Sequence, residues 1–120
     1  MKMEIVKLQN EAIARIISDE VIVKDTQTLL DFVMSVQYET GYRSIIVDKT
    51  NILEAFFDLK TKLLGEAFQK LVTYQLRLAI VGDYSSYVSK SWQDYMFESN
   101  KGNNVYFVAT EREAVEKLQS

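Results

Sequence analysis

The fold of this chain is decided by residues 76–83, which read LRLAIVGD. A short apolar run that ends at a glycine and an acid is typical of a strand covered on both faces. Two similar runs occur elsewhere, at residues 44–47 (SIIV) and 105–108 (VYFV). Longer segments with apolar residues at helical spacing separate the three runs. Buried strands that alternate with helices predict an α/β fold with a mainly parallel sheet and right-handed crossovers.

Several segments have the apolar periodicity of helices. The first starts after Asp25, a residue type that caps helix N-termini, and stops at Gly41. The second is expected to be the central helix, because its apolar stripe is the widest. The expected apolar faces are Leu29, Val33 and Val36; Leu59, Leu63, Ala67, Phe68, Leu71 and Val72; Val88, Trp92, Tyr95 and Met96; and a terminal helix over residues 111–118.

The region before the first helix predicts a β-hairpin. Its strands would be residues 3–8 and 12–17, joined through residues 9–11. Residues 21–23 (VIV) extend that hairpin or form a further small strand. Because the chain has no proline, repeat or linker-like stretch, residues 1–120 are expected to form a single domain. We predict a mixed, mostly parallel sheet of four or five strands with about four helices.

The composition excludes several kinds of chemistry. The chain has no cysteine and no histidine, so thiolate nucleophiles, Ser-His-Asp triads, haem ligation through these residues and common zinc sites are ruled out. Only an oxygen-liganded Mg²⁺ or Ca²⁺ site remains open, and we expect no metal and no cofactor. A net charge of −3 argues against nucleic acid as a partner. The N-terminal apolar stretch contains acids, so no signal peptide or membrane span is expected, and the cytoplasm is the expected location.

Candidate binding residues gather where the predicted strands end. In parallel sheets, ligands bind outside the carboxyl ends of the strands. The segment at residues 56–61 (FFDLKT) joins this edge because it precedes the expected central helix. The candidates are Asp48 and Lys49; Asp58 and Thr61; and Asp83, Tyr84, Ser85, Ser86 and Lys90.

Each group of candidates has a structural and a functional interpretation. Asp58 would cap the central helix, or that helix start would hold an anion or a phosphate on Thr61. Asp83, Ser85 or Ser86 would cap the next helix, or the same loop would form a ligand site with Lys90, rimmed by Tyr84 and Tyr87. The Asp48–Lys49 pair would be a solvated strand end, or part of that site. We expect Trp92 in the core.

Four segments together resemble a small bacterial family, domain of unknown function 4180. They are FFDLKTKLLGEAFQKL at 56–71, LRLAIVGDYS at 76–85, SKSWQDYMFESNKG at 89–102 and NVYFVATEREAVEKL at 104–118. The resemblance extends from about Met3 to Leu118. It implies the family but brings no described activity with it.

The chain is more distantly similar to STAS domains, the fold of anti-anti-sigma factors. This resemblance implies a STAS-like domain, with one layer of helices on a mixed sheet. It also implies a switch at the start of one helix, where a partner kinase phosphorylates a serine and so changes protein association. Asp58 matches the acid of that switch motif, Lys60 stands in the place of the serine, and Thr61 follows it.

The function expected from these features is a non-enzymatic regulatory or protein-interaction domain. Its protein partner would contact the face that carries Asp58, Thr61 and residues 83–90, and a homo-oligomer is a further expectation. The alternative is a small-molecule binding domain, for instance for an anionic ligand, that uses Lys49, Asp83, Ser85 and Lys90. An enzyme that works through Asp83 and Lys90 is the remaining hypothesis.

Overall fold

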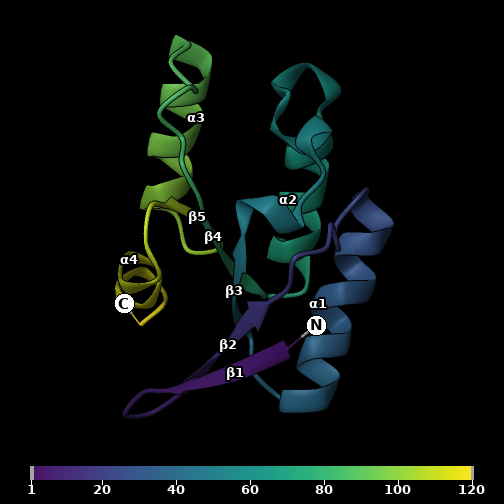
Figure 1. The fold of residues 1–120 in the computed structure, drawn as a ribbon, viewed down its shortest axis with the longest axis vertical. Coiled ribbons are helices and arrows are strands. Elements are labelled where there is room, and N and C mark those ends of the chain that lie inside the picture. The colour runs from purple at the N-terminus through teal and green to yellow at the C-terminus, as the bar shows by residue number, and fades with distance from the viewer. Residues whose placement is uncertain (1, 120) are drawn as a thin grey trace.

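The computed structural model describes residues 2–119, which form a five-stranded sheet with helices on both of its faces (Figure 1). The predicted α/β fold is confirmed. The elements in chain order are β1 (Lys2–Lys7), β2 (Ala12–Ile17), α1 (Thr26–Thr40), β3 (Ser44–Asp48), η1 (Lys49–Asn51), η2 (Glu54–Phe57), η3 (Leu59–Thr61), α2 (Leu63–Thr73), β4 (Arg77–Val81), α3 (Lys90–Lys101), β5 (Val105–Val108) and α4 (Glu111–Leu118). Within residues 2–119, no helix has both the length and the apolar character that a membrane crossing requires.

The strands lie in the sheet in the same order as in the sequence. β1 and β2 form the predicted antiparallel hairpin, and β2, β3, β4 and β5 are parallel to one another. In the register of the central strands, Ile45 lies between Ala14 and Leu78. Residues 21–23 do not form a further strand, because only Val23 makes an isolated bridge, to Ile52.

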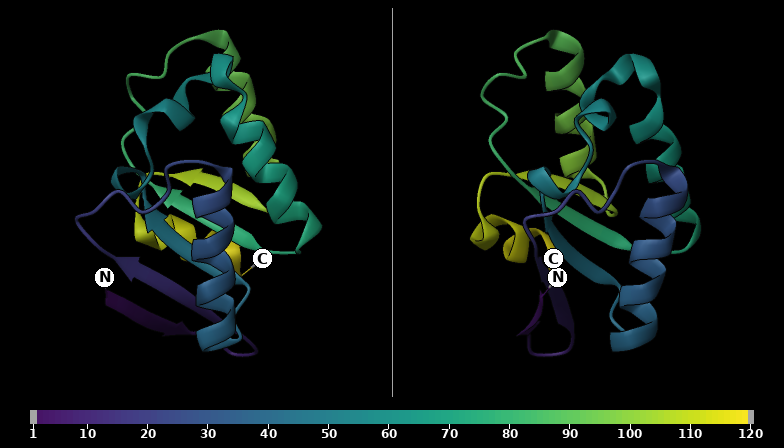
Figure 2. Two further views of the ribbon diagram at one scale, coloured as in Figure 1. Left: turned by 90° about the vertical axis from the view of Figure 1, so that its right-hand side faces the viewer. Right: turned by 45° about the vertical axis from the view of Figure 1, so that its right-hand side comes forward.

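The helices lie in two layers (Figure 2). Helices α1, α2 and α3 each connect one parallel strand to the next strand in the sheet. When all such crossovers are right-handed and each moves to the next strand in the same direction, the connecting helices lie on the same face of the sheet. Helix α4 follows the last strand and is free of that constraint. Its residues Ala114 and Leu118 pack on Ile46, Ala79 and Tyr106, on the opposite face. The expected single layer of helices is therefore wrong for α4.

Helix α1 has the ends that the sequence predicts. The side chain of Asp25 accepts a hydrogen bond from the Thr28 backbone N–H at 2.8 Å, and the Thr28 hydroxyl accepts one from the Asp25 N–H at 3.0 Å. Gly41 ends the helix with a left-handed φ of 77°. Two local signals, a capping box and a glycine that tolerates positive φ, are enough to define both ends of this helix.

The central helix α2 begins four residues later than its apolar stripe suggests. Leu59 lies in the short 3₁₀ turn η3, and Lys62 follows with a left-handed φ of 62° before the α-helix starts at Leu63. At the other end Val72 is 51% exposed, so the buried stripe is narrower than expected. The 3₁₀ turn satisfies its own hydrogen bonds locally and so delays the start of the α-helix.

Helix α3 is capped by a residue that the sequence did not single out. The Ser89 hydroxyl accepts a hydrogen bond from the Trp92 N–H at 3.2 Å. Asp83, Ser85 and Ser86 lie too early in the chain for this role. Val88 precedes the helix and is 78% exposed, so its predicted place on the apolar face is wrong, whereas Trp92 lies in the core as expected.

Candidate functional site

A hollow of about 540 Å³ opens at the carboxyl ends of β4 and β5 (the β4–β5 hollow). It lies between the loop after β4, helix α3 and the first turn of α4. The loop contributes Asp83, Tyr84 and Ser85, three of the candidates predicted from sequence. The hollow is also lined by Gln93, Met96, Phe97, Asn100 and Glu113. The hollow therefore lies where the rule about strand carboxyl ends predicts a binding site.

Asp83 organises the loop that borders the hollow. Its Oδ1 accepts a hydrogen bond from the Ser85 backbone N–H at 2.9 Å. That hydrogen bond holds the pKa of the Asp83 carboxyl below its ordinary value. Ser85 and Ser86 are exposed, but only Ser85 lines the hollow. The loop therefore presents the ionised Asp83 carboxylate to solvent together with the Ser85 hydroxyl, which also interacts with that carboxylate.

Tyr84 packs into the protein and does not form an exposed rim of the hollow. Its hydroxyl donates a hydrogen bond to the Ile80 carbonyl oxygen at 2.9 Å, and burial raises the pKa of its phenol. The ring meets Phe107 edge-on, with centroids 5.6 Å apart, and contacts Tyr87 at the same distance. Only part of the Tyr84 ring remains exposed at the wall of the hollow, where a ligand could contact it.

Lys49 lies outside the hollow, in an aromatic cradle of its own. Its Nζ is 4.6 Å from the centre of the Phe57 ring, 4.9 Å from that of Tyr87 and 3.4 Å from a carboxylate oxygen of Glu54. Burial alone would lower the pKa of Lys49, but its interactions with Tyr87 and Glu54 outweigh burial and raise that pKa. A side chain at Gly82 would stand 2.6 Å from the Lys49 Cβ, so glycine is needed there. Lys49 remains protonated and paired, and it joins the β3 end to the β4 loop.

Asp48 belongs to an ion-pair network on the α4 face of the sheet. Its Oδ1 accepts a hydrogen bond from the Arg15 guanidinium at 2.9 Å, and Glu111 accepts another from Arg15 at 2.6 Å. The Arg15 side chain is only 12% exposed, which reduces solvent screening of both pairs. This network fixes the start of α4 against β2 and β3, and so positions the wall of the hollow that α4 supplies.

Asp58 and Thr61 hold the 3₁₀ turn before α2. The Asp58 Oδ1 accepts a hydrogen bond from the Lys60 N–H at 3.0 Å, as predicted for a cap, but the capped element is η3. The Thr61 hydroxyl contacts the carbonyl oxygens of Asp58 and Ala55 at 2.9 and 3.2 Å, and it accepts a bond from the Leu63 N–H. A phosphate on Thr61 would remove this donor, so modification would loosen the turn. Phosphorylation of Thr61 stays a prediction.

Lys90 lies apart from every other candidate. Its Nζ pairs with the Asp94 carboxylate at 2.7 Å, one turn along α3, and both side chains are largely exposed. The structure therefore brings Asp83, Tyr84 and Ser85 together at the hollow, whereas Asp48, Lys49, Asp58, Thr61 and Lys90 make their contacts outside it. In residues 2–119, no group of three or more acidic side chains is arranged to hold a metal ion.

Sequence reasoning missed the residues that complete the hollow. Phe97 is 60% exposed, and Glu113 comes from a helix that reads as an ordinary charged one. Asn100 brackets Phe107 of β5: its Nδ2 donates to the Phe107 carbonyl oxygen at 3.1 Å, and its Oδ1 accepts from the Phe107 N–H at 2.7 Å. The local sequence does not predict that these three residues line the hollow, because the hollow forms only when α3, α4 and β5 pack together in the fold.

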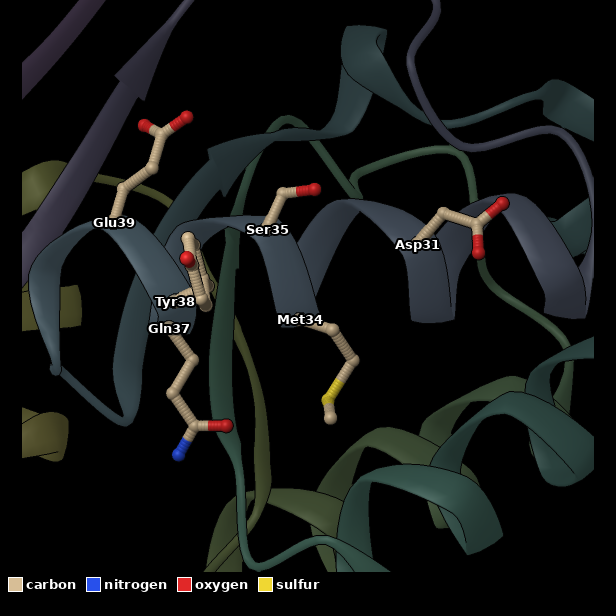
Figure 3. Close-up of a pocket in the computed structure, with 6 residues that line it drawn as sticks. All are labelled: Asp31, Met34, Ser35, Gln37, Tyr38 and Glu39. Atoms are coloured by element: carbon tan, nitrogen blue, oxygen red, sulfur yellow. The ribbon is translucent and has the colours of Figure 1, made fainter.

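A larger hollow of about 660 Å³ lies on helix α1. All its described lining residues come from this one helix, and Figure 3 shows their side chains fanning outward instead of converging. Tyr38 is 92% exposed, so it encloses nothing. The β4–β5 hollow is the better candidate because several chain segments converge on it.

Alkaline titration should reveal two part-buried tyrosines, Tyr84 at the hollow and Tyr95 on α3. Burial raises the pKa of Tyr95 to about 12 and also raises that of Tyr84, from an ordinary value of 10.0. Because unfolding lowers these pKa values, the two tyrosines should contribute their full stabilisation below pH 10 and progressively less as pH rises from 10 toward 12. Tyr84→Phe and Tyr95→Phe should each remove a late component from the tyrosinate absorbance. Tyr38→Phe is the exposed control, and an equal effect from it would contradict the prediction.

The model of the family described as "Domain of unknown function (DUF4180)" matches residues 8–118. No curated protein and no solved structure matches the chain.

Proposed function

The chain belongs to the DUF4180 family of domains of unknown function, and we propose that it acts as a non-catalytic binding module. Its contact surface is the β4–β5 hollow. The occupant is a segment of a partner protein that inserts an apolar side chain next to a lysine or arginine. Such a module works by association and so fits a regulatory role.

The observation that carries this proposal is an exposed aromatic ring beside acidic groups. Phe97 is 60% exposed and Met96 is half-buried, so the hollow offers apolar area to a partner. Asp83 and Glu113 are exposed on its border, and no lysine or arginine is found among its described lining residues. The Phe97 ring also lies 4.2 Å from the Lys101 ammonium, a cation–π contact within this chain, so the attraction for a partner's lysine or arginine comes from Asp83 and Glu113. Apolar anchors with complementary charge around them are the usual basis of affinity at protein interfaces.

The same geometry disfavours the anionic-ligand alternative. Such a ligand needs cations, but Lys49 is held by Glu54 and two rings, and Lys90 is paired with Asp94. The carboxylates of Asp83 and Glu113 would repel an anion in the hollow itself. Asp58 and Thr61, which use their polar groups within their own turn, are not part of the proposed contact surface.

A peptide-display selection tests the proposal. Random short peptides are selected on the immobilised protein, and their affinities are measured against variants by fluorescence anisotropy. We expect enriched peptides to combine an apolar residue with a neighbouring basic one. Phe97→Ser should weaken their binding about tenfold or more, equivalent to about 1.4 kcal/mol, and Glu113→Gln should weaken it less.

The matched control is Val88→Ser, which removes an apolar side chain that is 78% exposed but lies outside the hollow. This variant should bind the selected peptides like the unaltered protein. Peptides that bind equally well to Phe97→Ser would place the contact surface elsewhere. A selection without binders, together with a thermal shift by anionic metabolites, would favour the small-molecule alternative.

A further inference from the structure

The two edges of the sheet differ in whether their backbone groups have partners. On β5, the Ser99 hydroxyl donates a hydrogen bond to the Val105 carbonyl oxygen at 2.6 Å, and Asn100 bonds both the N–H and the carbonyl of Phe107. Helix α3 thus closes the β5 edge with side chains. Such covering is a common protection against strand pairing with other chains.

The β1 edge has no such cover. The Leu8 N–H donates a hydrogen bond to the Glu11 carbonyl oxygen and so closes the hairpin turn. In an antiparallel pair, the backbone groups of successive residues point alternately toward the partner strand and away from it. Because Leu8 points toward β2, the backbone N–H and carbonyl groups of Lys7, Ile5 and Met3 point away from β2. No residue in the range 2–119 provides a hydrogen-bond partner for these outward groups. Ile5, in the middle of this row, is 40% exposed.

We infer that β1 pairs with β1 of a second copy of this chain, antiparallel and centred on Ile5, so that two sheets join into one. In this register Ile5 faces the partner's Ile5, and Met3 faces the partner's Lys7. All three outward residues then lie in bonded pairs, about six hydrogen bonds in all at two for each pair.

Neighbouring registers are worse for physical reasons. If the pairing is centred on Glu4 or on Val6, only two of the three outward residues, Met3, Ile5 and Lys7, lie opposite outward residues of the partner. The third then has no bonded partner in the other β1 strand. Centring on Glu4 also places two glutamates directly opposite each other, which is destabilising. The Ile5-centred register avoids both defects and covers an exposed apolar side chain.

The closed β5 edge limits the assembly to two copies. The described part of each chain, residues 2–119, has one open edge, and pairing through a twofold axis uses it in both partners. No further edge then remains for addition of a third chain, so the contact is closed and does not propagate into fibres. This inference is independent of the β4–β5 hollow, which lies on the distant β4 and β5 side of the sheet.

Disulfide trapping tests the inference sharply, because the chain has no cysteine of its own. Directly opposed residues in a bonded antiparallel pair have Cα atoms about 5.5 Å apart, within the range that a disulfide spans. Ile5→Cys should therefore form a covalent dimer under mild oxidation at least about ten times faster than Ile17→Cys. Ile17 is the matched control, because it is 39% exposed but lies on β2, away from the edge.

Sedimentation of the unaltered protein provides the second measurement. We expect a monomer–dimer equilibrium, which Ile5→Lys should shift to monomer while circular dichroism shows the folded state retained. An equimolar mixture of Ile5→Lys and Ile5→Glu should restore the dimer, since opposite charges would then face each other. A protein that stays monomeric into the hundreds of micromolar, or a dimer indifferent to both Ile5 variants, would overturn the inference.

Discussion

Replacing Asn51 with alanine is expected to lower the free energy of unfolding by about 3 kcal/mol, since it deprives three part-buried backbone groups of their partner. Asn51 is 1% exposed. Its Nδ2 donates hydrogen bonds to the carbonyl oxygens of Ser18 and Glu20, both at 2.9 Å, and its Oδ1 accepts one from the Asp48 N–H at 3.0 Å. Each buried group left without its partner costs about 1–3 kcal/mol, and loss of the Asn51 amide leaves three backbone groups without this partner.

The measurement is urea unfolding followed by circular dichroism. Asn51→Asp is the informative companion, because it keeps the acceptor for the Asp48 N–H but turns the donor toward two carbonyls into a negative charge. It should be at least as destabilising as Asn51→Ala at neutral pH. Asn103→Ala, at an exposed turn position, should stay within about 0.5 kcal/mol of the unaltered protein. A loss below about 1 kcal/mol for Asn51→Ala would mean that water replaces the amide.

Replacing Trp92 with alanine should lower the free energy of unfolding by about 3–5 kcal/mol, because it opens a large cavity. The ring is 8% exposed and contacts rings from three other parts of the chain. Its centroid lies 6.3 Å from that of Phe57 before α2, 4.9 Å from Tyr87 in the β4–α3 loop and 6.1 Å from Phe107 of β5. No neighbouring ring can fill the space without leaving its own contacts.

A graded series separates cavity formation from a general effect of altering α3. Trp92→Phe keeps an aromatic ring and should cost less than half as much as alanine. Val88→Ala, just before the same helix and 78% exposed, should be nearly neutral. Circular dichroism is the required readout, because Trp92 is the only tryptophan and its removal abolishes that fluorescence signal. Equal losses for the phenylalanine and alanine variants would show that the indole N–H, not ring volume, is what matters.

The roles of Asn51 and Lys49 show why the candidate site was only partly predictable. The general rule about strand ends selected Asp83, Tyr84 and Ser85, and these three residues line a hollow. The rule does not say which neighbours neutralise a side chain. Lys49 is held by Phe57 of η2 and by Tyr87, which reaches it only when the β4 loop folds over η1. Asn51 bonds to Ser18 and Glu20, more than thirty positions earlier.

The sequence by itself determined the strands, their order along the chain and both ends of α1. Strand burial depends on consecutive apolar residues, as at 44–47, and a cap depends on residues within one turn, as with Asp25 and Thr28. These signals are local, so they can be read without the fold. The side of the sheet taken by α1, α2 and α3 follows from the handedness of crossovers.

Only the tertiary structure decided where α4 packs and which residues share the β4–β5 hollow. Within residues 2–119 helix α4 connects to no further strand, so its face is chosen by the apolar patch around Ile46 and Ala79 and by the Arg15 ion pairs. That choice brings Glu113 to the hollow opposite Phe97 of α3. Contacts between distant segments depend on how two packed cores fit together, which the local pattern of residues does not encode.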